Sequence, residues 1–204
     1  MVTKLRAPII VEGDSDKSKL GLIHIYTGDG KGKTTASLGL ALRALGCGYR
    51  VYMIQFLKSG STGELHAMEK WKGNFVIEQY GSDAIKERQQ KLQTFTENID
   101  IFKFNTDEIE KEACRLGIEK AFSVIQSQEY EMVILDEINC VLDKGLVAVE
   151  DVKKLFDAHG STELVLTGRD VPKQLFEHAD YVSVIYREKH PWQKGIKARR
   201  GVEY

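Results

Sequence analysis

The sequence predicts a single-domain α/β fold in which a mostly parallel sheet carries helices on both faces. Three observations predict this fold class. Apolar strand patterns alternate with amphipathic helical patterns, which is typical of parallel strands joined by right-handed crossovers. A glycine-rich loop at 28–32 separates the first strand pattern from the first helical pattern. A later strand pattern ends in two acidic residues, Asp136 and Glu137.

Length and composition fit one globular domain. The 204 residues suffice for one α/β core and are few for two, because domains usually hold about 100–200 residues. We expect an arm at 1–20 followed by one domain at 21–204. The hydrophobic share of 42% and the charged share of 29% are ordinary, and the net charge of -1 disfavours a dedicated nucleic-acid binder.

The chain lacks the patterns of secretion, membrane insertion and metal clusters. No apolar run approaches the about 18 residues of a membrane span, and the N-terminus has no signal-peptide pattern, so we expect a cytoplasmic protein with no membrane partner. Cys47, Cys114 and Cys140 are widely spaced and contain no C-x-x-C pair. We interpret them as reduced and structural, and the five histidines have no ligand spacing.

The loop at 28–32 has the composition of a phosphate-binding loop. Its three glycines let the backbone approach an anion, and the helix that follows directs N–H groups at it. Lys33 adds a positive charge, and Thr34 offers a hydroxyl to Mg²⁺. Thr27 stands where the consensus has glycine. An ordinary glycine-rich turn is the alternative, which the flanking strand and helix patterns disfavour.

The remaining elements follow from the period of the apolar residues. Strands are predicted at 22–26, 51–56, 75–80, 132–135, 164–167 and 181–186. Helices are predicted from the loop to residue 45, at 64–71, from 106 to 125, at 149–156 and at 172–179. The segment 82–105 is either a functional lid or a stretch with a polar helix at 84–93.

Three charged residues follow strands whose carboxyl ends should meet. Asp136 and Glu137 form a Walker B pattern, which places carboxylate oxygens beside a Mg²⁺ ion held by the phosphate loop. Arg169 follows the strand at 164–167 and is a candidate phosphate contact. A solvated surface arginine is the alternative for Arg169.

The C-terminal tail, 190–204, is basic. Its cations are Lys194, Lys197, Arg199 and Arg200. An anionic site would attract these side chains, so the tail either folds back toward the phosphate loop or remains solvated.

These patterns alone indicate an enzyme or switch that binds a magnesium nucleotide, and a family resemblance narrows this. The resemblance rests on motifs that occur in one order from residue 22 to the C-terminus: Tyr26-Thr-Gly-Asp-Gly-Lys-Gly-Lys-Thr-Thr35, Leu42-Arg43-Ala-Leu-Gly46, Gln55-Phe56-Leu-Lys58, Leu135-Asp136-Glu137, Thr167-Gly168-Arg169 and Lys194-Gly-Ile-Lys-Ala-Arg-Arg-Gly-Val-Glu-Tyr204. Together they resemble the P-loop (RecA-like) corrinoid adenosyltransferases, which act on cob(I)alamin and cob(I)yrinic acid a,c-diamide.

The resemblance implies a reaction that needs no general base. Cobalt(I) of the reduced corrinoid attacks the 5′ carbon of ATP, the adenosyl group moves to cobalt, and triphosphate leaves. A cobalt(I) nucleophile carries no proton to remove, so positioning and charge stabilisation would do the catalytic work. The family also implies a homodimer and a flavodoxin-type reductase as partners.

The resemblance further implies a role for residues at matching positions. Catalysis would depend on Lys33, Thr34 and Glu137. ATP would be bound, with its triphosphate reversed relative to ordinary P-loop hydrolases, by Thr27, Gly28, Asp29, Gly30, Lys31, Gly32, Lys33, Thr34, Thr35, Arg43 and Arg169. Mg²⁺ or Mn²⁺ would be bound by Thr34, Asp136 and Glu137. The corrinoid would contact Phe56, Lys58, Tyr80 and Glu137.

One motif of the family is missing. Many relatives have a Gly-Phe-Thr-Trp stretch whose aromatic rings displace the lower ligand of the corrinoid, but here Gly81 is followed by Ser-Asp-Ala-Ile. Either Tyr80, Phe95, Phe102 or Phe104 replaces these rings, or the protein prefers a corrinoid without a lower base, or its corrinoid role is altered. Core packing is the alternative role for those aromatic residues.

Two other functions fit the same motifs. A P-loop ATPase or small-molecule kinase would release ADP and would use the two carboxylates to position Mg²⁺ with water or an acceptor. A non-catalytic nucleotide-binding module would bind ATP and a corrinoid without turnover.

Overall fold

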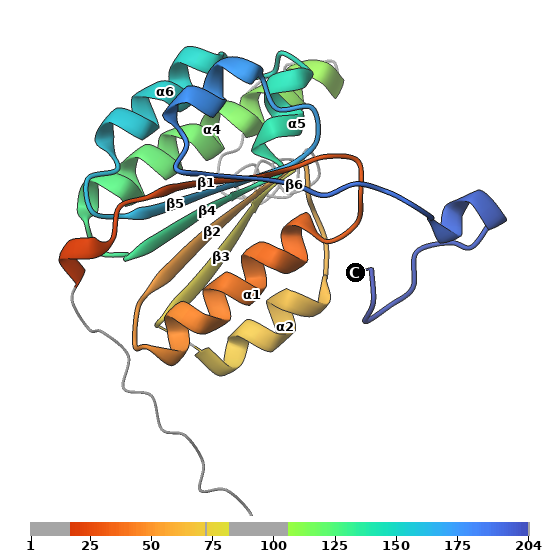
Figure 1. The fold of residues 1–204 in the computed structure, drawn as a ribbon, viewed down its shortest axis with the longest axis horizontal. Helices are drawn as coiled ribbons and strands as arrows, with labels where there is room; N and C mark the ends of the chain where they lie inside the picture. Colours follow the sequence, from red (N-terminus) through yellow and green to blue (C-terminus); the bar gives the residue numbers. More distant parts are fainter. Residues whose placement is uncertain (1–16, 72, 82–105, 204) are drawn as a thin grey trace, which may run out of the picture.

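The computed structural model describes residues 17–71, 73–81 and 106–203 (Figure 1). The predicted segment at 82–105, with Phe95, Phe102 and Phe104, lies outside these residues. Of the predicted arm at 1–20, only 17–20 are described, and they begin with the 3-10 helix η1 (Lys17–Lys19).

The core of the described residues is one sheet of six strands, all parallel, in the order β3-β2-β4-β5-β1-β6. The strands are β1 (Ile23–Thr27), β2 (Val51–Phe56), β3 (Phe75–Tyr80), β4 (Met132–Asp136), β5 (Glu163–Thr167) and β6 (Tyr181–Val184). Every residue of β2, β4 and β5 is buried, as expected for central strands covered on both faces.

Helices cover both faces of the sheet (Figure 1). One face carries α1 (Lys33–Gly46) and α2 (Gly63–Met68), and the other carries α4 (Thr106–Ser127), α5 (Ile138–Asp143) and α6 (Val149–Ala158). Short 3-10 helices complete the chain: η2 (Glu69–Trp71), η3 (Lys173–His178) and η4 (Pro191–Lys194).

Strand alternation divides the apolar residues between two cores. Met53 of β2 and Ile134 of β4 pack with α1, whereas Ile54 and Leu135, one residue further along each strand, pack on the opposite side. The predicted fold class is therefore confirmed: one parallel sheet with helices on both faces.

Most predicted elements are present, with strand ends that differ by at most two residues. The helix α5 was not predicted, because six residues are too few to show a helical period. The predicted helix at 172–179 is the 3-10 helix η3. The predicted helix at 64–71 is divided between α2 and η2.

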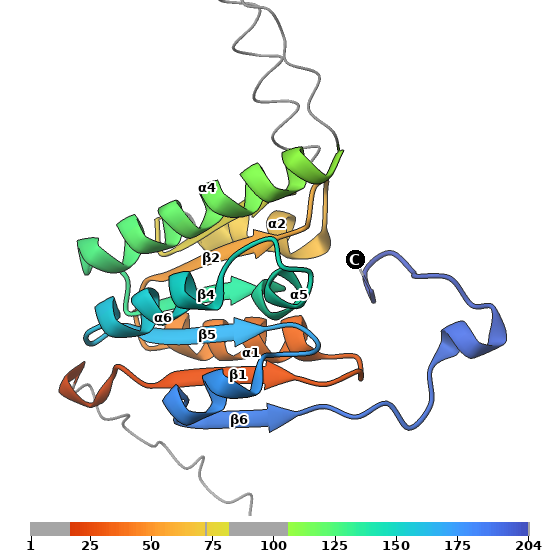
Figure 2. The same cartoon turned by 90° about the horizontal axis from the view of Figure 1, so that it is seen from above.

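The parallel arrangement brings the carboxyl ends of all strands to one edge, where the C-terminal tail also leaves β6 (Figure 2). The strand β5 lies between β1 and β4, so Thr167 at its end stands between the phosphate loop and Asp136. Among the described residues, no helix is both long and apolar enough to cross a membrane.

Candidate active site at the phosphate loop

The glycines of the phosphate loop meet two different requirements. Gly32 precedes α1 with a φ of 122° and has open space where a side chain would begin. Gly28, with a φ of 100°, has the carbonyl oxygen of Ile185 only 2.4 Å from the position of a Cβ, and the N–H of Gly30 donates to that oxygen at 2.8 Å. Only Gly32 therefore leaves the space that an anion needs, whereas Gly28 and Gly30 join the loop to the chain beyond β6.

Lys33 folds back over the loop. Its Nζ donates to the carbonyl oxygens of Gly28 at 2.7 Å and Gly30 at 2.8 Å. Burial lowers the pKa of Lys33 from its ordinary value of 10.5, the Glu137 carboxylate opposes that shift, and Arg169 adds to it. The ammonium is thus held where the loop closes, at the amino end of α1.

Asp136 is fully buried at the end of β4 and joins the loop to the neighbouring strand. Its Oδ1 accepts hydrogen bonds from the hydroxyls of Thr34 at 2.8 Å and Thr167 at 2.7 Å. The same Thr167 oxygen accepts a hydrogen bond from the backbone N–H of Glu137 at 3.0 Å. Thr167 therefore orients both acidic residues, although only its neighbour Arg169 was predicted to serve the site.

Glu137 adopts a left-handed conformation, with a φ of 65°, between β4 and α5. Its Oε2 accepts a hydrogen bond from Cys140 Sγ at 3.0 Å, and that sulfur accepts one from the N–H of Arg169 at 3.2 Å. Burial and the Glu137 carboxylate raise the pKa of the Cys140 thiol to about 11. All three cysteines are free, as predicted, but Cys140 also contacts a predicted site residue.

A cavity of about 230 Å³ collects most of the predicted ATP contacts. It is lined by residues 29–35, Glu137 and Arg169, together with His190 and Glu203, which were not predicted. Lys33, Arg169 and the amino end of α1 give the cavity cationic and N–H groups suited to a polyphosphate.

The oxygen atoms at this cavity suit a hard cation such as Mg²⁺ or Mn²⁺. Thr34 supplies a hydroxyl and Glu137 a carboxylate at the cavity, and the buried Asp136 carboxylate accepts the hydrogen bond of the Thr34 hydroxyl. Such oxygen atoms are the donors that these ions prefer. Among the residues that the structure describes, no three His, Cys, Asp or Glu side chains converge as a metal cluster. A metal here would therefore need further oxygen ligands, which a triphosphate offers.

The C-terminal tail returns to the phosphate loop. Lys31 Nζ donates to the carbonyl oxygen of Val202 at 3.2 Å, and Arg187, in the segment that leads into the tail, pairs with Asp29 at 3.3 Å. Hydrogen bonds from Arg199 hold the pKa of the Glu203 carboxyl at about 2. An acidic side chain of the tail thus faces the cavity.

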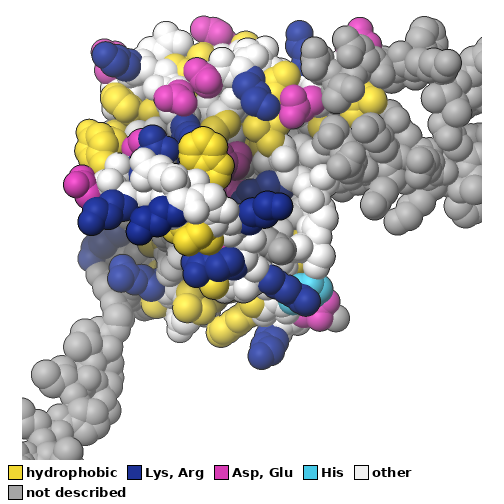
Figure 3. All heavy atoms as spheres, turned by 90° about the vertical axis from the view of Figure 1, so that its right-hand side faces the viewer, with side chains coloured by type: hydrophobic (Ala, Val, Ile, Leu, Met, Phe, Trp, Pro, Cys, Tyr) yellow, Lys and Arg dark blue, Asp and Glu magenta, His cyan; other side chains and the backbone are white. Residues whose placement is uncertain are grey.

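The basic side chains of the tail remain in solvent. Lys194, Lys197, Arg199 and Arg200 are exposed, and Figure 3 shows lysine and arginine side chains across the face of the molecule that carries the tail. The tail therefore folds back toward the phosphate loop, which is one of the two predicted alternatives. Its cations stay outside the cavity.

Other predicted site residues lie elsewhere. Thr27 is buried at the end of β1, where its carbonyl oxygen accepts from Ile185. Phe56 and Tyr80 are buried in the core, and the Tyr80 hydroxyl donates to Glu78. Lys58 pairs with Asp136 at 2.6 Å. The predicted corrinoid contacts of Phe56 and Tyr80 thus have no exposed ring to support them.

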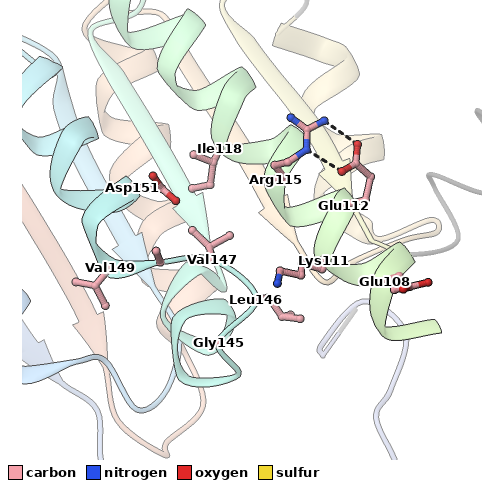
Figure 4. A pocket seen from close by; sticks show the side chains of 11 residues that line it. Glu108, Lys111, Glu112, Arg115, Ile118, Gly145, Leu146, Val147, Val149 and Asp151 are labelled. Carbon is pink, nitrogen blue, oxygen red and sulfur yellow. Dashed lines mark hydrogen bonds and ion pairs between the residues drawn. The ribbon is translucent and has the colours of Figure 1, made fainter. Parts of the chain in front are cut away.

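Two further cavities lie apart from the phosphate loop. Arg43, in the last turn of α1, lines one of about 270 Å³ beside His24 and Tyr181, at the opposite edge of the sheet from the phosphate loop. The other, of about 1040 Å³, lies between α4 and the chain that leads into α6 (Figure 4). Its rim carries the ion pair of Glu112 and Arg115. Neither cavity contains a residue of the phosphate loop.

Comparisons with known proteins show the family of the chain. The family model for "ATP:corrinoid adenosyltransferase BtuR/CobO/CobP" matches residues 19–204. A corrinoid adenosyltransferase of a Sinorhizobium species is 34% identical over 189 residues, covering 90% of this chain and 80% of that protein. The corrinoid adenosyltransferase of Escherichia coli K12 is 30% identical, covering 90% of this chain and 86% of that protein.

A solved structure agrees with the fold alone. The flagellar accessory protein FlaH of Methanocaldococcus jannaschii superposes with a TM-score of 0.51 at 14% sequence identity, covering 81% of this chain and 71% of that one.

Proposed function

The chain belongs to the family of ATP:corrinoid adenosyltransferases, and on that basis we propose that the cavity at the phosphate loop holds the triphosphate of ATP as a leaving group. The enzyme transfers the 5′-deoxyadenosyl group of ATP to cobalt(I) of a corrinoid and releases triphosphate. The alternative of an ATPase or kinase that releases ADP is not favoured by this family membership.

The observation that carries this proposal is the gathering of charge in one cavity. The N–H groups at the start of α1, Lys33 and Arg169 face the same space of about 230 Å³. As cobalt(I) attacks the 5′ carbon, the bond to the triphosphate oxygen breaks and negative charge grows on that oxygen. Fixed cations and N–H groups stabilise this charge without reorganising, which lowers the barrier. Lys33 and Thr34 at the phosphates and Glu137 beside them are our proposed catalytic residues.

A divalent cation, Mg²⁺ or Mn²⁺, is part of the proposal. The hydroxyl of Thr34 and the carboxylates of Asp136 and Glu137 would hold it, and it would neutralise charge on the triphosphate. Thr34 is suited to this role because its proton is donated to Asp136, which leaves the lone pairs of its oxygen for other partners.

The remaining roles rest on the family resemblance. These are a contact of Thr27 with ATP, a homodimeric assembly, a flavodoxin-type electron donor and a cytoplasmic location. The choice between cobalamin and cobyrinic acid a,c-diamide belongs with them. The implied contacts of Arg43 with ATP and of Phe56 and Tyr80 with the corrinoid are not part of the proposal, because Arg43 lies at the opposite edge of the sheet and both rings are buried.

Product analysis tests the proposed function. The protein is incubated anaerobically with ATP, Mg²⁺ and a chemically reduced corrinoid, and the phosphate products are separated by ³¹P NMR. We expect triphosphate in equal amount to the adenosylated corrinoid. ADP as the product would establish the kinase or ATPase alternative, and binding of both substrates without a product would indicate a non-catalytic module.

A further inference from the structure

Lys58 occupies an unexpected place in the site. Its Nζ lies 2.6 Å from Asp136 Oδ2, with its side chain 27% exposed and that of Asp136 fully buried. The resemblance implied a contact between Lys58 and the corrinoid, but in the structure this lysine is the cationic partner of the Walker B aspartate.

The hydrogen bonds of Asp136 leave no acceptor position open. Two carboxylate oxygens have about four positions at which they accept hydrogen bonds. Thr34 and Thr167 donate to Oδ1, while Lys58 and, at 3.3 Å, Gln55 Nε2 donate to Oδ2. A metal ion could bind Asp136 directly only by displacing one of these donors.

The backbone around Lys58 is fixed from two sides. Leu57 adopts a left-handed φ of 57°, which turns the chain at the end of β2, and its N–H donates to Tyr80. A Cβ on Gly81 would lie 2.5 Å from the carbonyl oxygen of Lys58. A left-handed leucine is costly, and such conformations persist where the surroundings determine them, often at functional sites.

We propose that Lys58 is a positioning residue that prevents a free metal ion from binding directly to Asp136. The metal therefore enters the site together with the triphosphate of ATP. The inference rests on the proposed metal role. The ammonium group and a divalent cation compete for the same carboxylate and repel each other at short range. The negative charge of a triphosphate outweighs the repulsion between the ammonium group and the metal ion, whereas the single negative charge of Glu137 does not. Meanwhile the ion pair with Lys58 keeps the Asp136 carboxylate aligned on Thr34.

Binding of Mn²⁺ without nucleotide tests this role, because the signal of free Mn²⁺ in electron paramagnetic resonance falls when the ion binds. We expect weak binding to the wild type and about tenfold or greater tightening in Lys58→Met, since the competing cation is gone and one acceptor position of Oδ2 is open. The double variant Lys58→Met/Asp136→Asn should lose this gain. Lys120→Met is the matched control, because Lys120 pairs with Glu78 at 3.6 Å, away from the phosphate cavity.

Several results would overturn the inference. Tight Mn²⁺ binding by the nucleotide-free wild type would do so, and so would equal affinities in wild type and Lys58→Met. If Lys58→Met does not fold, judged by circular dichroism, Lys58→Gln is measured instead. It removes the charge and keeps a neutral donor that Mn²⁺ displaces more easily than an ammonium group, so we expect a smaller gain in Mn²⁺ affinity, and no gain would overturn the inference.

One more arm separates this inference from the proposed metal role. The wild type is titrated with Mn²⁺ in the presence of inorganic triphosphate, where we expect a bound ion for each chain. If no ion binds with triphosphate present, the metal role itself fails. If the ion binds but Lys58→Met is unchanged without triphosphate, only the role of Lys58 fails.

Discussion

At the scale of single residues, the site depends on buried polar groups that stabilise one another. Asp136 has no exposed surface, so its charge is tolerable only with the hydrogen bonds from Thr34 and Thr167 and the ammonium of Lys58. Lys33 is also buried, and its lowered pKa reflects that environment. We interpret the burial of these two charged side chains as serving the site and not the stability of the fold.

The pH dependence of ATP binding should report on Lys33. The protonated ammonium binds phosphate, so affinity should be high at neutral pH and fall as the pH rises through a pKa that lies below 10.5. Lys33→Ala should bind weakly at every pH and lose about 100-fold or more in kcat/KM while keeping its fold. Calorimetry from pH 7 to 10 measures this, with the exposed Lys154→Ala as the control. An affinity for ATP that stays unchanged from pH 7 to pH 10 would contradict this role.

Replacing Thr167 by valine should destabilise the protein by about 2–4 kcal/mol. Valine keeps the shape but removes the donor to the Asp136 carboxylate and the acceptor for the Glu137 N–H. Serine keeps both and should restore most of the stability. Urea unfolding measures the change, and Thr162→Val, which removes a bond to a neutral carbonyl, should cost about 1 kcal/mol. Equal losses for the two valine variants would argue against the charged network.

At the scale of elements, the sequence predicts what repeats locally and misses what depends on distant contacts. The strands are found because β-branched and apolar residues run through them, and the phosphate loop because Lys33 and Thr34 follow it directly. Thr167 and Cys140 were missed as site residues because their roles arise only where β5 and α5 meet Asp136 and Glu137. Thr167 stands in the motif Thr167-Gly168-Arg169, but neither that motif nor the composition around Cys140 specifies these contacts.

Packing between helix and sheet gives a paired prediction at two helical glycines. Gly117 of α4 has a ring carbon of Phe56 2.5 Å from the position of a Cβ, whereas Gly39 of α1 has open space. Gly117→Ala should therefore destabilise the protein by about 1–3 kcal/mol, and Gly39→Ala should stabilise it by about 0.5–1 kcal/mol. Thermal unfolding of both variants checks this. A stabilised Gly117→Ala variant would show that α4 and β2 are not packed this closely.

At the scale of the whole molecule, the tail closes a site that begins more than 150 residues earlier in the chain. Lys31 contacts Val202, and Glu203 lines the phosphate cavity. The basic composition of 190–204 predicted attraction to an anion, but not that the acidic Glu203 would face the cavity. That outcome depends on how the chain turns after β6, which no local pattern specifies.

Removing the charge of Glu203 should strengthen the binding of inorganic triphosphate by about threefold or more. With a pKa near 2, this carboxyl is ionised at neutral pH and repels the ligand, and its loss also frees Arg199. Calorimetry on Glu203→Gln measures the gain, which should shrink as salt is added. Glu188→Gln, between β6 and the tail and outside the cavity, should change little. Weaker binding by Glu203→Gln would mean that this residue assists the ligand instead.

The fate of the 5′ carbon of ATP tests the account most directly. ATP labelled with ¹³C at that carbon is turned over anaerobically with a reduced corrinoid, and the product is examined by ¹³C NMR. We predict that the label becomes bonded to cobalt while all three phosphates leave together. A label that remains in ADP or AMP would contradict the account, because the phosphate loop would then serve cleavage of a phosphate bond rather than departure of the triphosphate.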